Sequence, residues 1–165
     1  MPASKKPILT RLTAAAITQR EDGRYLFVEE RSQGRLVFNQ PSGGWEPGET
    51  MMQTAIREAA EEASVVFRPT SFLGMLVTSH TKKTGVSVCT IRAAYAGDVL
   101  SGFPGVPRDE TILRTVWMTY KEAMLHRDRH RSSAVMRCLD LYQSGRRFPI
   151  DSLNEVNDDT WRHNA

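Results

Sequence analysis

Apolar and polar residues alternate in short runs along most of the chain, a pattern typical of β-strands buried on one face. These runs predict strands over residues 12–18, 24–30, 36–39, 65–72, 74–81, 86–96 and 111–119. Glu21, Asp22 and Gly23 are a turn signal that predicts a hairpin between the first two strands. Residues 82–85 predict a second hairpin, and Pro69 predicts a break in the strand over residues 65–72.

Helical periodicity replaces the alternation further along the chain. Residues 51–63 are mostly good helix formers, and Thr50 with Gln53 forms a capping-box pattern just before them. A short helix is predicted over residues 120–126 and a longer one over residues 132–144. This order of strands, helix, strands and helices predicts an α/β (α+β) protein, an α/β/α sandwich built on a mixed β-sheet.

Composition favours one globular domain, because the chain has 165 residues, 40% of them apolar and 25% charged. We expect a flexible N-terminus over residues 1–10, a domain over residues 11–150 and a C-terminal tail over residues 151–165. The sequence has no apolar run of membrane-spanning length and no secretory signal at its start, and its two cysteines suggest no disulfide scaffold. We therefore expect a cytoplasmic monomer or homodimer. The net charge of +3 is far from that of a dedicated nucleic-acid binder and argues against nucleic acid as a partner.

The predicted helix over residues 51–63 concentrates negative charge. Glu58, Glu61 and Glu62 share one helical face, Arg57 adjoins it, and Glu49 stands just before the helix. At an effective dielectric of about 20, each pair of unscreened carboxylates about 5–6 Å apart costs on the order of 3 kcal/mol. A divalent cation with hard oxygen ligands, Mg²⁺ or Mn²⁺, would offset this repulsion.

An exposed acidic helix face is the ordinary explanation of such a charge run. Gly43, Gly44 and Gly48 favour a site instead, because glycines allow the backbone to approach a ligand closely and have no purpose before a plain surface helix.

These residues resemble the Nudix box, the signature of the Nudix hydrolases, with the pattern G-x5-E-x7-R-E-U-x-E-E-x-G-U, where U is an apolar aliphatic residue. Gly43, Glu49, the pair Arg57-Glu58, the pair Glu61-Glu62 and Val65 match it in spacing. Ala59 is small for its aliphatic position. Ser64 replaces the glycine that ends the family's helix in a left-handed conformation, which puts the local geometry in question.

Two further segments resemble the NudJ-type phosphatase branch of this family, namely residues 38–41, which read FNQP, and residues 142–149, which read YQSGRRFP. This resemblance implies hydrolysis of nucleoside di- and triphosphates or of thiamine-type pyrophosphates.

The family resemblance implies a Mg²⁺ or Mn²⁺ site formed by Glu58, Glu61, Glu62 and the carbonyl of Gly43, with Arg57 orienting a glutamate. The general base stays open between the box, at Glu58 or Glu61, and the loop before the last strand, at Asp109 or Glu110. We include Glu110 among the candidate catalytic residues.

Candidate substrate-binding residues lie around the box. Asn39 and Gln40 precede it, Trp45 lies within the glycine turn, where it would stack on a heterocycle or pack on the loop, and Arg31 is a candidate phosphate ligand. The basic run over residues 126–131 is interpreted as a solvated loop between helices.

The leading hypothesis is a divalent-metal-dependent enzyme that hydrolyses a diphosphate linkage or a terminal phosphate in a small phosphorylated substrate. The alternatives are an RNA 5′-end pyrophosphohydrolase and a non-catalytic nucleotide-binding Nudix domain.

Overall fold

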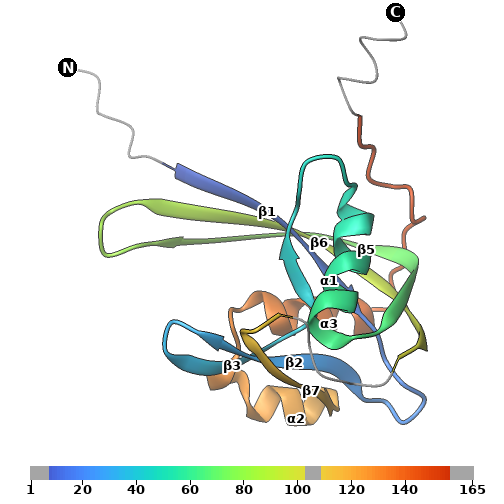
Figure 1. Cartoon of the computed structure of the whole chain (residues 1–165). Coiled ribbons are helices and arrows are strands. Elements are labelled where there is room, and N and C mark those ends of the chain that lie inside the picture. The colour runs from blue at the N-terminus through green and yellow to red at the C-terminus, as the bar shows by residue number, and fades with distance from the viewer. Residues whose placement is uncertain (1–7, 103–108, 157–165) are drawn as a thin grey trace, which may run out of the picture.

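A computed structural model describes residues 8–102 and 109–156, and within them the strands form two sheets (Figure 1). The first sheet is mixed, with strand order β4-β1-β6-β5, where β1 (Ile8–Ile17) is parallel to β6 (Ser87–Ser101). Both β4 (Ser42–Gly44) and β5 (Val66–Thr81) pair antiparallel with their neighbours. The second sheet is antiparallel and contains β2 (Tyr25–Ser32), flanked by β3 (Arg35–Asn39) and β7 (Ile112–Met118).

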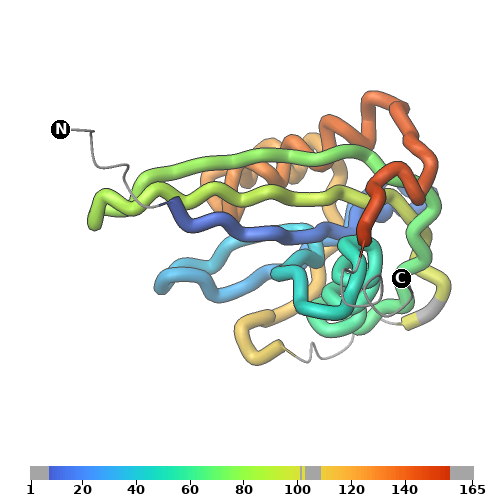
Figure 2. The backbone as a smooth tube through the Cα atoms, turned by 90° about the horizontal axis from the view of Figure 1, so that it is seen from above, coloured from blue at the N-terminus to red at the C-terminus, as the bar shows by residue number. Residues whose placement is uncertain are grey.

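Helices cover both faces of the mixed sheet. The helix α1 (Met51–Ala63) packs on one core, while α2 (Tyr120–Leu125) and α3 (Ala134–Gln143) pack on the other. A short 3-10 helix, η1 (Arg127–Arg129), connects α2 to α3. The predicted α/β/α sandwich with a mixed sheet is therefore confirmed, with the strands divided between two sheets. Figure 2 shows β5, β6 and β1 running side by side with α3 behind them.

The alternation of side chains in β1 explains why this strand is rich in alanine. Ala14 and Ala16 belong to the core under α1, whereas Ala15 and Ile17 belong to the core under α3. Because the strand is covered on both faces, small side chains allow the helices to approach it closely. Alanine is uncommon in strands, but in this strand its small size suits the packing between two helices.

The predicted pairing of the first two strands is wrong. The turn exists, since Gly23 N–H donates to the Arg20 carbonyl at 2.9 Å. A bridge between Gln19 and Tyr25 and a hydrogen bond of 3.2 Å from the Leu26 N–H to the Thr18 carbonyl join its two arms, but β1 and β2 belong to different sheets. The two edges of β1 are occupied by β4 and β6, so β2 diverges into the other sheet.

The predicted break at Pro69 is also wrong, because β5 continues through this residue as one strand. β5 lies at the edge of its sheet, so the missing N–H of proline removes no hydrogen bond that a further strand would need. The irregularity remains as a shift of register between Pro69 and Ser71.

The ends of the described chain are more ordered than expected. β1 begins at Ile8, inside the segment expected to be flexible. In the predicted tail, Leu153 packs against the α1 core, and the Glu155 carboxylate accepts a hydrogen bond of 2.8 Å from the N–H of Met51. Residues 103–108, which precede Asp109 and Glu110 in the loop expected before the last strand, lie outside the described residues.

Candidate active site

Arg57 is the centre of a hydrogen-bond network that ties the glycine turn to α1. Its Nη2 donates to the Gly44 carbonyl at 2.8 Å and to Glu49 Oε1 at 2.8 Å, and its Nε donates to Glu49 Oε2 at 3.1 Å. Its Nη1 donates to Glu58 Oε1 at 2.7 Å and to Glu61 Oε2 at 3.2 Å. One guanidinium therefore fixes the turn and brings these two helix carboxylates together.

Glu49 acts within this network as a structural partner of Arg57. Besides the bidentate pair, its carboxylate accepts hydrogen bonds from the Thr54 hydroxyl at 2.7 Å and from the Glu46 N–H at 2.9 Å. The hydrogen bonds from Arg57 are the main reason that its pKa is lowered to about 2. Glu49 is therefore ionised over the whole physiological range, and it holds the loop in place.

Gly43 is required by the position of Glu58. A Cβ atom at residue 43 would lie 2.1 Å from Glu58 Oε1, closer than any real contact of this kind. The Glu58 carboxylate thus rests directly against the backbone of the turn. The first glycine of the box is what allows this approach.

Glu58 and Glu62 are buried carboxylates, with 8% and 6% of their surface exposed. Burial raises the pKa of Glu58, and burial together with the charges of Glu58, Glu30 and Asp109 raises the pKa of Glu62 to about 9. Glu62 Oε2 accepts a hydrogen bond of 2.8 Å from the Ser42 N–H. Without a cation, the surroundings thus favour the protonated form of these two carboxyl groups.

These carboxylates fit a divalent cation by their chemistry. No three His, Cys, Asp or Glu side chains of residues 8–102 and 109–156 are already gathered as a metal cluster. Still, the donors are hard oxygens, and Glu58 and Glu62 would together supply two negative charges to a cation once ionised. A cation bound by them would favour the ionised carboxylates, which burial disfavours.

The helix α1 ends in the left-handed conformation at Ser64, with φ 54° and ψ 37°. The serine thus adopts the backbone conformation that the family assigns to glycine, and the local geometry of the helix end is retained.

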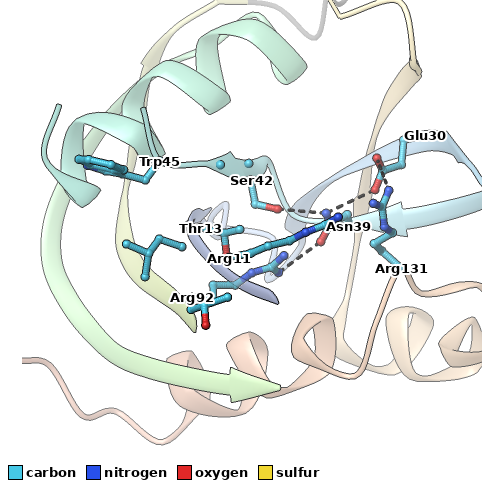
Figure 3. Close-up of a pocket in the computed structure, with 12 residues that line it drawn as sticks. Arg11, Thr13, Glu30, Asn39, Ser42, Trp45, Arg92 and Arg131 are labelled. Atoms are coloured by element: carbon cyan, nitrogen blue, oxygen red, sulfur yellow. Dashed lines mark hydrogen bonds and ion pairs between the residues drawn. The ribbon is translucent and has the colours of Figure 1, made fainter. Parts of the chain in front are cut away.

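A cavity of about 570 Å³ opens beside β4 (Figure 3). Asn39, Trp45 and Gly43 line it. Asn39 Nδ2 donates to Ser42 Oγ at 3.0 Å. The Trp45 indole donates to the Glu49 carbonyl at 2.6 Å, and its ring also lines a second, more apolar cavity of about 560 Å³.

Other expected substrate contacts are not brought to this cavity. Gln40 is fully buried, and its Nε2 donates to the Val135 carbonyl at 2.8 Å, so it ties the turn to α3. Arg31 is exposed on β2 and does not line the cavity.

Of the two loop candidates for the general base, the structure places Asp109 beside the carboxylates. Its backbone N–H donates to the Glu61 carbonyl at 3.4 Å, and its charge raises the pKa of both Glu58 and Glu62. Glu110 is exposed.

Sequence reasoning missed the arginines of the cavity. Arg11 from β1, Arg92 from β6 and Arg131 from the segment before α3 line it together with Glu30. These residues are scattered along the sequence, and only the strand pairing brings them together.

The basic run over residues 126–131 is not simply a solvated loop, because its arginines neutralise buried carboxylates. Arg131 pairs with Glu30 at 3.1 Å, and Arg129 pairs with Glu29. Burial opposes ionisation of Glu29, but hydrogen bonds from Arg114 and Arg129 outweigh it and lower its pKa.

Comparisons with known proteins agree with the fold and the box. Residues 9–138 match the family model of the NUDIX domain. The chain is 31% identical over 146 residues to Phosphatase NudJ of Escherichia coli (strain K12), which covers 88% of this chain and 92% of that protein. The NUDIX hydrolase from Nitrosomonas europaea has a similar structure, with a TM-score of 0.78 and 33% identity over 92% of this chain and 98% of that chain.

The MutT NUDIX hydrolase from Burkholderia pseudomallei, with a TM-score of 0.64 and 19% identity over 80% of this chain and 97% of that one, supports the fold alone. The chain belongs to the Nudix family. It is a Nudix hydrolase, an enzyme of a family that acts on pyrophosphate-containing substrates. The described helices include none that is both apolar and long enough to cross a bilayer.

Proposed function

We propose that this protein hydrolyses a diphosphate linkage or a terminal phosphate in a small substrate, either a nucleoside di- or triphosphate or a thiamine-type pyrophosphate. The observation that carries this proposal is the buried pair Glu58 and Glu62, of which Glu58 lies against the Gly43 backbone where a Cβ atom would otherwise be. Similarity to a relative named a phosphatase supports the release of inorganic phosphate. We also propose a cytoplasmic location, which the free thiols of Cys89 and Cys138 support.

In this proposal Glu58, Glu61, Glu62 and the Gly43 carbonyl hold Mg²⁺ or Mn²⁺. The bound cation neutralises phosphate charge and lowers the pKa of a water molecule. Arg57 keeps Glu58 and Glu61 in position through its Nη1 bonds of 2.7 Å and 3.2 Å. Asp109 is the group that accepts a proton from the attacking water, because it lies beside the carboxylates, whereas Glu110 is exposed.

The substrate lies in the cavity beside β4 in this proposal. Trp45, with 39% of its surface exposed, offers a ring face to a heterocycle, and Asn39, whose amide already donates to Ser42 and Glu30, shapes the wall of the cavity. Gln40 and Arg31 have no direct part in binding, since Gln40 is buried and Arg31 does not line the cavity.

A phosphate-release assay over a panel of substrates with Mg²⁺ and Mn²⁺ tests the proposal. The panel contains nucleoside di- and triphosphates, thiamine pyrophosphate and a short 5′-triphosphorylated RNA. Glu62→Gln is the blank, and Glu21→Gln, which changes an exposed glutamate, is the matched control. We expect turnover with a small substrate and a loss of at least about 100-fold in Glu62→Gln only. Unchanged turnover in Glu62→Gln would refute the metal-ligand assignment, and turnover of RNA alone would refute the substrate class.

A further inference from the structure

Arg92 carries its charge inside the protein, and its hydrogen-bond partners among the described residues are neutral. It has 8% of its surface exposed. Its Nη1 donates to Asn39 Oδ1 at a long 3.4 Å, and its other contact is the Cys138 thiol. Its Nε has no hydrogen-bond partner among the described residues. A buried cation is costly unless an anion pairs with it, so this arrangement calls for a missing partner.

The other buried charged groups of this region are neutralised by ion pairs with residues of the same chain. Glu29 forms ion pairs with Arg114 and Arg129, and Glu30 forms an ion pair with Arg131 at 3.1 Å. The Glu30 carboxylate lines the same cavity as Arg92, but it is already paired with Arg131. Arg92 differs from these groups because, although its charge partly opposes the rise that burial causes in the pKa of Glu30, it forms no ion pair with a carboxylate of the described residues.

Support of Asn39 does not explain a charged residue here. A long bond to an amide oxygen needs only a neutral donor, which glutamine would supply without the cost of burying a cation. The charge of Arg92 therefore indicates that an anion binds in the cavity.

The cavity gathers further positive charge around Arg92. In the parallel pairing of β1 and β6, Thr13 lies opposite Arg92 and Arg11 lies opposite Thr90, so Arg11, Thr13 and Arg92 share one face of the sheet. Figure 3 shows Arg92 and Arg131 on either side of Asn39, with Arg11 extending toward it. With Glu30 as the only acidic residue lining this cavity within the described chain, the balance is two positive charges.

This positive cavity adjoins the carboxylates of α1 across β4. Ser42, Gly43 and Gly44 line the cavity, while on the other side Ser42 bonds to Glu62 and Gly43 contacts Glu58. A neighbouring cavity of about 510 Å³ has Arg11, Arg92 and Arg131 in its lining as well, and it continues toward Lys82. A ligand that spans both sides of β4 would meet a cation site at one end and guanidinium groups at the other.

We propose that Arg92, together with Arg11 and Arg131, binds a phosphoryl group of the substrate other than the two that the hydrolysed linkage joins. This subsite rests on the proposed function, and it makes a nucleoside triphosphate a better substrate than the matching diphosphate. A phosphoryl group fits because it carries up to two negative charges and accepts the paired hydrogen bonds that guanidinium groups donate.

The first test is binding without metal, which does not depend on catalysis. Metal-stripped protein in chelator-free buffer is heated with inorganic tripolyphosphate or with citrate. We expect tripolyphosphate at saturation to raise the Tm of the wild type by at least about 3 °C and citrate to have a much smaller effect. The shift is lost in Arg92→Gln and kept in Arg68→Gln, which alters an exposed arginine paired with Asp98.

Arg92→Gln removes a buried charge, so without ligand its Tm should equal or exceed that of the wild type. Arg11→Gln, at an exposed position, provides a second variant with little risk to folding, and it should reduce the shift as well. No shift in the wild type, an undiminished shift in Arg92→Gln and Arg11→Gln, or an equal shift with citrate would each overturn the proposal.

The second test compares kcat/KM for a nucleoside triphosphate and its diphosphate in the presence of Mg²⁺. We expect Arg92→Gln to lower the ratio of the two values on the order of 10-fold, mainly through the KM of the triphosphate. An equal loss on both substrates would overturn the subsite. If the wild type hydrolysed neither nucleotide, the proposed nucleotide substrate would fail, while the metal-free binding experiment would still decide whether the arginines bind phosphoryl groups.

Discussion

Replacing Gly43 by alanine tests whether the close approach of Glu58 to the glycine turn matters for catalysis. The added Cβ would lie 2.1 Å from Glu58 Oε1 and 2.3 Å from its Cδ. The added Cβ meets only the flexible end of the Glu58 side chain. We therefore expect the carboxylate to move by about 1 Å and the backbone to stay in place. A misplacement of about 1 Å can cost on the order of 100-fold in rate.

We therefore expect Gly43→Ala to lower kcat/KM for phosphate release by about 100-fold while the fold survives. Displacement of Glu58 also weakens its 2.7 Å bond to Arg57, and the loss of a hydrogen bond between charged groups costs about 1.5–3 kcal/mol of unfolding free energy. Steady-state kinetics measures the first effect, and urea denaturation measures the second.

Gly44→Ala is the matched control, because a Cβ at residue 44 would meet nothing within 4 Å. It should lose far less activity than Gly43→Ala. In a Glu58→Gln background, Gly43→Ala should add little further loss, since both changes disable the same carboxylate. Equal losses in Gly43→Ala and Gly44→Ala, or full additivity with Glu58→Gln, would refute this reasoning.

Three further predictions follow from single groups. Ser64→Gly should raise the unfolding free energy in urea by about 0.5–1 kcal/mol, because Ser64 has φ 54°, where glycine avoids the steric cost; a lower midpoint would contradict this. The folded pKa of Glu62 is raised to about 9, so its stability contribution in metal-free protein is full below about pH 4.5 and is lost as the pH rises through 9. The metal-free Tm should fall between pH 6 and 9, and a similar fall in Glu62→Gln would exclude Glu62 as its cause. Asp109→Asn should lower kcat at least about 10-fold and Glu110→Gln less than about 2-fold, and the reverse order would assign the base to Glu110.

The sequence predicted the box because its chemistry is local. The spacing of Glu58, Glu61 and Glu62 along one helix face, and the capping pair Thr50 and Gln53, depend on residues a few positions apart. The structure contains both sides of this capping box, with the Gln53 side chain accepting from the Thr50 N–H at 2.7 Å.

The partners of β1 could not be predicted, because a turn signal indicates that the chain reverses but not which strand edges remain free. β1 pairs in parallel with β6, whose residues lie far along the chain, and this pairing alone places Arg11 beside Arg92. The arginine-lined cavity therefore has no signal in the sequence. Arg131 likewise belongs to a run that resembles a solvated loop until Glu30 is placed opposite it.

The burial of Gln40 has a similar origin. A polar residue beside a glycine turn suggests a ligand contact, yet Gln40 serves the packing of α3 by donating to the Val135 carbonyl at 2.8 Å. Only the tertiary position of α3 distinguishes these two roles.

The most direct measurement is Mn²⁺ binding to the metal-stripped protein, followed by electron paramagnetic resonance of the free ion. We expect the wild type and the exposed-site control Glu21→Gln to bind Mn²⁺ alike, and Glu62→Gln and Glu58→Gln to bind it at least about 10-fold more weakly, because each removes a buried carboxylate ligand. Equal Mn²⁺ affinity in all four proteins would contradict the assignment of the cation site to the buried carboxylates of α1.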